Sequence, residues 1–342
     1  MYISILKNRI QEHNIIKEYG NLFSDGKIMP LIEIINLKIG RKEYDQETLI
    51  NYYDENIESD FFIDYFAYDT KYEPTDKSKI ELPIKIRTEN EEEYLERLLS
   101  TTLSNKAIPV IFVKKSKESI LSNTAIEFLI LELQHKKDKI AVRLEAELFD
   151  DFYGVIKRHL RPNDYFFYDI NESTMDPFIM DMHQLMFGSF NKILTYSPRE
   201  RKLNNGSFLE SGFTDLINCF AREEYKNYGF NGYADYAGLK DDLPKNGGNG
   251  KGAALSMIYN HENNKFYTIT NHDTDLGPKG YKEVRDEMFN PSVYSKLDGD
   301  NCLAYKFVKE RMIDRNKTGS FAQWNRITIL RMLSEMKKVY RL

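Results

Sequence analysis

Short hydrophobic runs alternate with helix-length segments along most of the chain. Seven of these runs have the length of a strand and are rich in apolar residues, as strands covered on both faces are. In chain order they read MPLIEIIN (29–36), DFFIDYFAYD (60–69), AIPVIFVKK (107–115), KIAVRLEAE (139–147), DYFFYDIN (164–171), NKILTYSP (191–198) and GYADYAG (232–238). Strands that alternate with helices are typical of a parallel sheet.

Helical periodicity fills most of the intervals between these runs. It predicts helices over residues 9–20, 45–55, 89–103, 118–136, 146–160, 175–187 and 208–228. The first of them ends at Gly20, a residue type that commonly closes a helix. Residues 70–90 are polar and interrupted by proline, which predicts an excursion from the scaffold.

The last third of the chain has a different pattern. Residues 253–271, AALSMIYNHENNKFYTITN, predict two strands joined by an Asn-rich turn, and the C-terminal sixty residues are mostly helical in pattern. Seven parallel strands plus this hairpin predict a (β/α)8 TIM-like barrel whose last unit is modified, as one domain over residues 1–342. A doubly wound open sheet is the alternative.

Composition narrows the class of protein. The chain has 342 residues, a formal net charge of -5 and 30% charged residues, so it is a globular protein whose overall charge does not favour nucleic acid. Its two cysteines, Cys219 and Cys302, are too far apart for a CxxC site. The N-terminal stretch becomes charged after six residues, and no run has the length of a membrane span. We therefore expect a cytoplasmic protein without membrane contact.

Charged residues lie at or near the ends of several predicted strands. The carboxyl ends of parallel strands meet at one mouth of a barrel, where active sites are found. We call the five residues predicted to converge there the strand-end ring: Glu33, Asp64, Arg143, Asp169 and Asp235. Three of them, Glu33, Asp64 and Asp169, are candidate ligands for Mg²⁺ or Mn²⁺ or candidate general bases, and Arg143 is a candidate phosphate-binding group.

The strand-end ring has a structural alternative. Buried charges must be paired, so the same residues could form interior salt bridges, with Arg143 paired to Glu33 or Glu145. Because side chains alternate along a strand, Asp69 could also stand in place of Asp64.

A Gly-rich loop after the seventh run is a second candidate site. Residues 245–252, KNGGNGKG, could hold a phosphate through backbone N–H groups near Gly248 and Gly250, with charge from Lys245 and Lys251. The loop lacks the glycine and serine or threonine positions of a Walker loop. A solvated surface loop is the alternative.

Several short motifs follow one another in the order found in a known family. They are MYISILKNRIQE, KIMPLIEIIN, AVRLE, YFFYDIN, KILTYSP, GYADYAG and, near the end, WNRITILRML. Together they resemble the beta family, named after a phage beta protein, although residues 199–206 (RERKLNNG) depart from its aromatic-rich loop. The resemblance implies a place on phages or defence-associated regions and assigns no reaction.

Two functions of different classes are compatible with these observations. The first is a metal-assisted phosphoester hydrolase or nuclease-like enzyme with its site at the carboxyl ends of the strands, linked to phage–host conflict. The second is a non-catalytic binding or sensor module in phage defence that works with a partner protein encoded nearby. Neither a substrate nor a partner follows from the residues.

Overall fold

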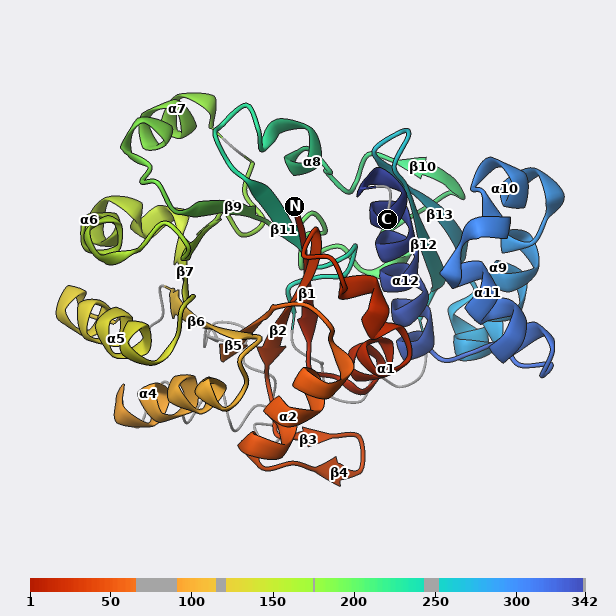
Figure 1. Ribbon diagram of the computed structural model, residues 1–342. Coiled ribbons are helices and arrows are strands. Elements are labelled where there is room, and N and C mark those ends of the chain that lie inside the picture. The colour runs from red at the N-terminus through yellow and green to blue at the C-terminus, as the bar shows by residue number, and fades with distance from the viewer. Residues whose placement is uncertain (66–90, 115–120, 175, 243–251, 341–342) are drawn as a thin grey trace. The chain divides into compact units, whose positions relative to one another are not determined.

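The computed structural model describes residues 1–65, 91–114, 121–174, 176–242 and 252–340 (Figure 1). The chain divides into two compact units. The first comprises residues 1–196 and 221–235, and the second comprises residues 197–220 and 236–342. Whether the two together form one domain, as the pattern predicts, stays a prediction.

The first unit is a closed barrel of eight parallel strands, within the ranges described, in the order β1-β11-β9-β8-β7-β6-β5-β2. The predicted (β/α)8 barrel is therefore confirmed, and the doubly wound open sheet is wrong. The strands are β1 (Tyr2–Lys7), β2 (Ile28–Ile34), β5 (Phe61–Tyr65), β6 (Ala107–Val113), β7 (Ala141–Glu145), β8 (Tyr165–Asp169), β9 (Asn191–Thr195) and β11 (Gly232–Asp235).

The N-terminal segment closes the barrel, and the predicted hairpin does not. β1 pairs in parallel with both β2 and β11, which joins the two ends of the sheet. All six residues of β1 are buried. The hairpin strands are antiparallel and belong to the second unit, so the assignment of the eighth strand to residues 253–271 is wrong. An antiparallel pair cannot supply the single parallel strand that closure needs.

Helices cover the outside of the barrel strands in the first unit (Figure 1). They are α1 (Ile10–Tyr19), α2 (Gln46–Asn56), α4 (Glu91–Ser100), α5 (Asn123–Lys136), α6 (Phe149–His159), α7 (Pro177–Met186) and the short α8 (Ala221–Glu224). A two-stranded ribbon of β3 (Lys38–Ile39) and β4 (Lys42–Glu43) precedes α2. Several helices begin at the residue types that cap helix N-termini, such as Asp45 before α2 and Ser122 before α5.

Gly20 follows α1 as predicted, but for a different physical reason. Its φ is -59°, so no left-handed turn requires glycine there. A Cβ at this position would lie 1.7 Å from the carbonyl oxygen of Asn56, the last residue of α2. Glycine is therefore needed because the two backbones approach each other closely.

The second unit has its own sheet and helices. Its strands β10 (Gly212–Thr214), β13 (Lys265–Asn271) and β12 (Ala254–Asn260) form a three-stranded sheet in that order. Its helices are α9 (Tyr281–Met288), α10 (Pro291–Lys296), α11 (Leu303–Val308) and α12 (Phe321–Tyr340). The long C-terminal helix is where the pattern predicts it.

The predicted helix over residues 208–228 is mostly wrong. Only Ala221–Glu224 is helical in that range, and Gly212–Thr214 forms β10. β10 pairs with β13, with Gly212 opposite Thr268. A strand partner distant in the sequence thus overrides the local helical pattern.

Side chains of alternate residues fill the barrel interior. Phe62 of β5 contacts Phe167 and Tyr165 of β8, with ring centroids 5.1 and 4.9 Å apart, although β6 and β7 separate these strands in the sheet. The interior is therefore a packed core. Because side chains alternate, the residues two positions beyond Phe62 and Phe167, Asp64 and Asp169, also point inward.

Candidate active site

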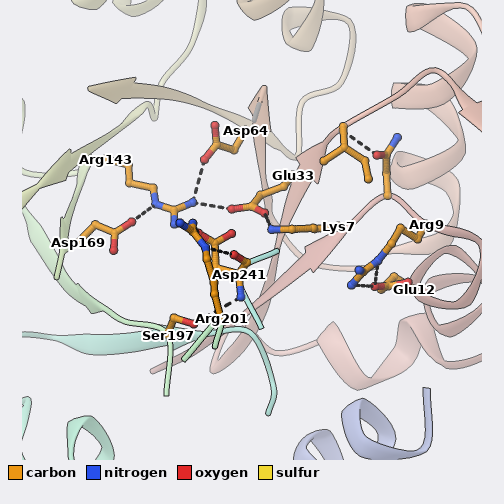
Figure 2. Close-up of polar contacts among 12 residues, drawn as sticks. Lys7, Arg9, Glu12, Glu33, Asp64, Arg143, Asp169, Ser197, Arg201 and Asp241 are labelled. Atoms are coloured by element: carbon orange, nitrogen blue, oxygen red, sulfur yellow. Dashed lines mark hydrogen bonds and ion pairs between the residues drawn. The ribbon is translucent and has the colours of Figure 1, made fainter. Parts of the chain in front are cut away.

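Arg143 contacts three of the other four residues of the strand-end ring (Figure 2). Its Nη1 donates to Oε1 of Glu33 at 2.8 Å and to Oδ2 of Asp64 at 3.1 Å, and its Nε donates to Oδ2 of Asp169 at 2.7 Å. The three carboxylates come from β2, β5 and β8 and the guanidinium from β7. The predicted convergence of these four side chains at the carboxyl ends of the strands is what the structure has.

Lys7 joins the same group from β1. Its Nζ donates to Oε2 of Glu33, whose other oxygen is held by Arg143. We call Lys7, Glu33, Asp64, Arg143 and Asp169 the Arg143 cluster. Each of its side chains is at most 2% exposed. Sequence reasoning missed Lys7 because it did not count β1 as a barrel strand.

The register of the strands explains why these residues meet. Lys7 is paired with Glu33 across β1 and β2, and Glu33 with Asp64 across β2 and β5. Arg143 stands two strands away from Asp64 and reaches it over the ring of Phe112 on the intervening strand, with 4.3 Å between its Cζ and the ring centroid. Such a contact between a guanidinium and an aromatic face is favourable and steadies the arginine.

Asp64 differs from the other carboxylates of the Arg143 cluster in its hydrogen bonding. It is fully buried, and while Oδ2 accepts from Arg143, Oδ1 has no hydrogen-bond partner among the residues that the structure describes. Burial raises the pKa of this carboxyl to about 7, against the opposing effect of Arg143 and with a further raising effect of Glu33 and Asp169.

The charges of the Arg143 cluster explain why the pKa of Asp64 is raised. Three carboxylates and two cations carry one excess negative charge in total, and protonation of Asp64 removes it. A buried uncompensated charge is costly, so the group with the weakest hydrogen bonding takes up the proton most readily. Asp64, with one oxygen lacking a partner in the described ranges, is that group.

Asp235, the fifth residue of the strand-end ring, lies at the end of β11. It is buried and accepts a hydrogen bond from the phenol of Tyr2 at 2.8 Å. Its register partner is Ser4 of β1. Asp235 thus lies at a strand end, and its contact with Tyr2 is one that the sequence did not indicate.

A second ion pair lies at the ends of β6 and β7. Nζ of Lys114 is 3.6 Å from Oε1 of Glu145, which also accepts from Nδ2 of Asn171 at 2.9 Å. Lys114 and Glu145 are 7% and 6% exposed. Asn171 lies two residues after the end of β8 and has a φ of 53°, a left-handed conformation that asparagine tolerates. An asparagine just beyond a predicted strand is the signal by which the sequence could have indicated it.

The three predicted metal ligands each form an ion pair with Arg143. Glu33, Asp64 and Asp169 each direct an oxygen at its guanidinium. Over the part of the chain that the structure describes, no group of three or more His, Cys, Asp or Glu side chains is arranged to hold a metal ion. Mg²⁺ or Mn²⁺ as a cofactor stays a prediction.

Residues 245–251 of the Gly-rich loop, which include Gly248, Gly250 and Lys251, lie outside the described residues, as does Asp69. Arg199, the first residue of the segment 199–206 (RERKLNNG), belongs to the second unit and is 6% exposed. Its guanidinium donates to Oδ1 of Asn205 at 3.1 Å and contacts Sδ of Met257 at 3.2 Å.

Comparison with known proteins adds no relative. A scan of the chain against models of protein families finds no match, and a search among curated proteins finds none either. No helix in the described ranges is long and apolar enough to cross a membrane. A reaction for this protein is therefore inferred from the site itself.

Proposed function

We propose that the barrel is a hydrolase in which Asp64 acts as the general acid or general base. The observation that supports this is the geometry of Asp64 at the carboxyl end of β5, with one oxygen held by Arg143 and the other without a partner among the described residues. A carboxyl group whose pKa is about 7 can give or accept a proton near neutral pH, which is the property of an efficient general acid or base.

The rest of the Arg143 cluster positions this group. Arg143 is fixed by Glu33 and Asp169 as well as by the face of Phe112, and Lys7 in turn holds Glu33. A guanidinium held at several points keeps the carboxyl of Asp64 in one orientation. Arg143 and Lys7 are therefore positioning residues in this proposal.

The proposed substrate class is a phosphoester, and Lys114 is the cation proposed to bind its phosphate. The sequence predicts Arg143 as the phosphate-binding group, but the Nε and Nη1 of Arg143 already donate to three carboxylates. Lys114 has a longer contact, 3.6 Å, with Glu145, and that carboxylate is shared with Asn171. Lysine binds phosphate as a point charge and can exchange one anion for another.

A divalent cation is not required by this proposal. Its three predicted ligands are bound to Arg143, so a metal ion would have to displace the guanidinium from the centre of the cluster. Proton transfer by Asp64 needs only the arrangement described.

The proposal is tested with p-nitrophenyl phosphate and bis(p-nitrophenyl) phosphate as model substrates. Replacing Asp64 by Asn is expected to lower kcat by about 10²- to 10⁴-fold, the usual contribution of a general acid or base. Replacing Lys114 by Met is expected to raise KM. The matched control is Asp60→Asn, one residue before β5 at the opposite end of the same strand, where Asp60 pairs with Lys139.

Two results would contradict the proposal. Equal activity of wild type and Asp64→Asn would remove Asp64 from the mechanism, and an equal loss in Asp60→Asn would show a general effect on folding. If the protein hydrolysed p-nitrophenyl glycosides or carboxylic esters but neither phosphoester, the role of Asp64 would stand and the proposed substrate class would be wrong.

A non-catalytic binding or sensor module is the second candidate function. The observation that favours it is that Lys7, Lys114 and Arg143 each contact a carboxylate, as in a set of ion pairs that only stabilises the barrel. This candidate predicts no turnover of any ester by the folded protein and a stable complex with a partner protein.

The resemblance to the beta family supports a role in phage–host conflict for either candidate. We propose that the protein acts in the cytoplasm in that setting, where its two buried cysteines are free thiols. The test is phage plaque formation on cells that produce wild type or Asp64→Asn. Equal plaque numbers with and without the wild-type protein would contradict this role.

A further inference from the structure

Helix α7 of the first unit has an inner face made by few side chains. Met180 and His183 are buried, at 2% and 5% exposure. The ring of His183 stacks on Phe149 of α6 at 3.8 Å between centroids, and its Nδ1 lies 2.8 Å from the hydroxyl of Tyr168 on β8. These contacts attach α7 to the barrel.

The outer face of α7 is apolar, which is the reverse of what a surface helix needs. Five large apolar side chains of its ten residues are exposed, whereas only one acidic residue, Asp181, lies in the helix. The exposed residues are Phe178 (70%), Ile179 (42%), Met182 (47%), Leu185 (88%) and Met186 (43%). We call these five the α7 seam. Contiguous apolar surface of this kind marks an interaction site.

The area of the α7 seam suits a protein interface. Its exposed fractions amount to about three complete side chains, or roughly 600 Å² at about 200 Å² for each large side chain. A standard interface buries about 800 Å² on each partner. One helix thus supplies most of the surface that a stable complex needs.

The spacing of the α7 seam identifies the partner. Counted from Met182, its members stand at positions -4, -3, 0, +3 and +4, a pattern that reads the same in both directions along the helix. A two-fold axis through Met182 would set Phe178 opposite Met186 of a second copy and Ile179 opposite its Leu185, at matching heights along antiparallel helices. We propose that α7 pairs with α7 of a second copy of this chain in an antiparallel homodimer.

Low charge favours the same partner. Apart from Asp181, the exposed residues of α7 carry no charge at neutral pH, so two copies can approach without like-charge repulsion along the seam. A partner recognised through charge would need complementary residues that this helix does not have.

The first test measures the oligomeric state of the full chain by light scattering after size exclusion and by sedimentation. Wild type is expected to be a dimer at micromolar concentration. Met182→Glu sets two carboxylates against each other at the axis and is expected to weaken the dimer by about 100-fold or more. The matched control is Phe128→Glu on α5, where Phe128 is also exposed, at 52%, and the dimer is expected to be unchanged.

The second test fixes the antiparallel register. Ile179→Glu and Leu185→Lys are each expected to weaken the dimer, and the double variant is expected to restore it because residue 179 of one copy faces residue 185 of the other. Met182→Cys should be joined to itself by a short bis-maleimide, while Phe128→Cys should not. Cys219 and Cys302 are buried and do not compete for the reagent.

Four results would overturn the proposal. A wild-type monomer at about 100 µM would remove the dimer, and a dimer insensitive to Met182→Glu would place its interface elsewhere. Failure of the double variant to restore pairing that both single variants lose would exclude the antiparallel register. A monomer that binds phosphatidylcholine vesicles, and loses that binding in Leu185→Glu, would make the α7 seam a lipid-binding surface instead.

Discussion

Arg143 holds Asp64 by one oxygen only. The Nη1 of Arg143 donates to Oδ2 of Asp64 at 3.1 Å, while Oδ1 is buried without a hydrogen-bond partner among the described residues. The same Nη1 donates to Glu33 at the shorter distance of 2.8 Å. Asp64 is thus the less strongly bound of the two carboxylates.

The stability of the protein should depend on pH through Asp64. Its pKa in the folded protein, about 7, is above the ordinary value of 3.8, mainly because of burial. The contribution of Asp64 to the stability of the folded protein is therefore complete below about pH 4 and is lost as the pH rises through 7. Between these limits the free energy of unfolding of wild type should fall, relative to Asp64→Asn, by about 1.4 kcal/mol per pH unit.

Urea denaturation of both proteins from pH 5 to pH 8 measures this difference. The control is Asp45→Asn, because a hydrogen bond from the backbone of Thr48 lowers the pKa of Asp45 below 3.8. Its contribution is lost only as the pH falls below that range, so its difference from wild type should stay constant. A constant difference for Asp64→Asn as well would contradict a raised pKa.

Loss of Arg143 should be among the most destabilising single changes. Arg143→Met leaves the carboxylates of Glu33, Asp64 and Asp169 buried without their shared cation, and removal of one partner of a buried ion pair costs about 3–5 kcal/mol. Denaturation at pH 8, which is above the pKa of about 7 of Asp64 in the wild type, would show the larger loss. The loss should be smaller at pH 5, where Asp64 is protonated.

Arg199 provides the matched control for this change. It is also buried, but its guanidinium donates to Asn205 and to the carbonyl oxygen of Leu203 and contacts Met257, and no ion pair of Arg199 occurs in the described ranges. Arg199→Met should therefore cost less than Arg143→Met and should not depend on pH between 5 and 8. Equal losses in both variants would indicate that the carboxylates around Arg143 are not the reason.

Divalent cations distinguish proton transfer from metal-assisted chemistry. Since Arg143 binds the three candidate ligands, we expect millimolar Mg²⁺ or Mn²⁺ to leave the melting temperature of wild type unchanged. A ligand that binds only the folded protein raises its melting temperature. An increase in wild type that is absent in Asp64→Asn would favour the metal site predicted from the sequence.

The contact between α1 and α2 should not tolerate a side chain at position 20. Gly20→Ala would bring a methyl group within 1.7 Å of the backbone oxygen of Asn56, and the resulting shift should cost about 1–3 kcal/mol. Gly154 in α6 has open space around its Cβ position, so Gly154→Ala should gain about 0.5–1 kcal/mol from helix propensity. Thermal unfolding of the two variants compares these opposite signs. A neutral Gly20→Ala would show that the two helices can separate without loss.

Much of the first unit follows from local pattern. Each of the seven predicted runs overlaps a barrel strand, and the helices over 45–55, 118–136 and 146–160 match α2, α5 and α6 within a few residues. Buried parallel strands are recognisable because both faces must be apolar. The strand β1 was missed as a barrel member because it stands alone at the start of the chain, without a preceding helix to complete a unit.

The candidate site divides in the same way. The sequence indicated Glu33, Asp64, Arg143 and Asp169 as strand-end residues, because strand length and side-chain alternation are local properties. It could not choose between a catalytic group and a set of ion pairs. That choice depends on which oxygen of Asp64 is held by Arg143, and these two residues are 79 positions apart in the chain.

The amino-acid pattern alone thus predicts parallel strands with charged residues at their carboxyl ends, and it leaves a closed barrel and an open sheet as alternatives. The fold then shows that β1 closes the barrel, that Lys7 joins Glu33, and that Asp64 has a raised pKa. Closure and convergence depend on the register between distant strands. The pKa depends on burial and on the sum of neighbouring charges, which local sequence does not contain.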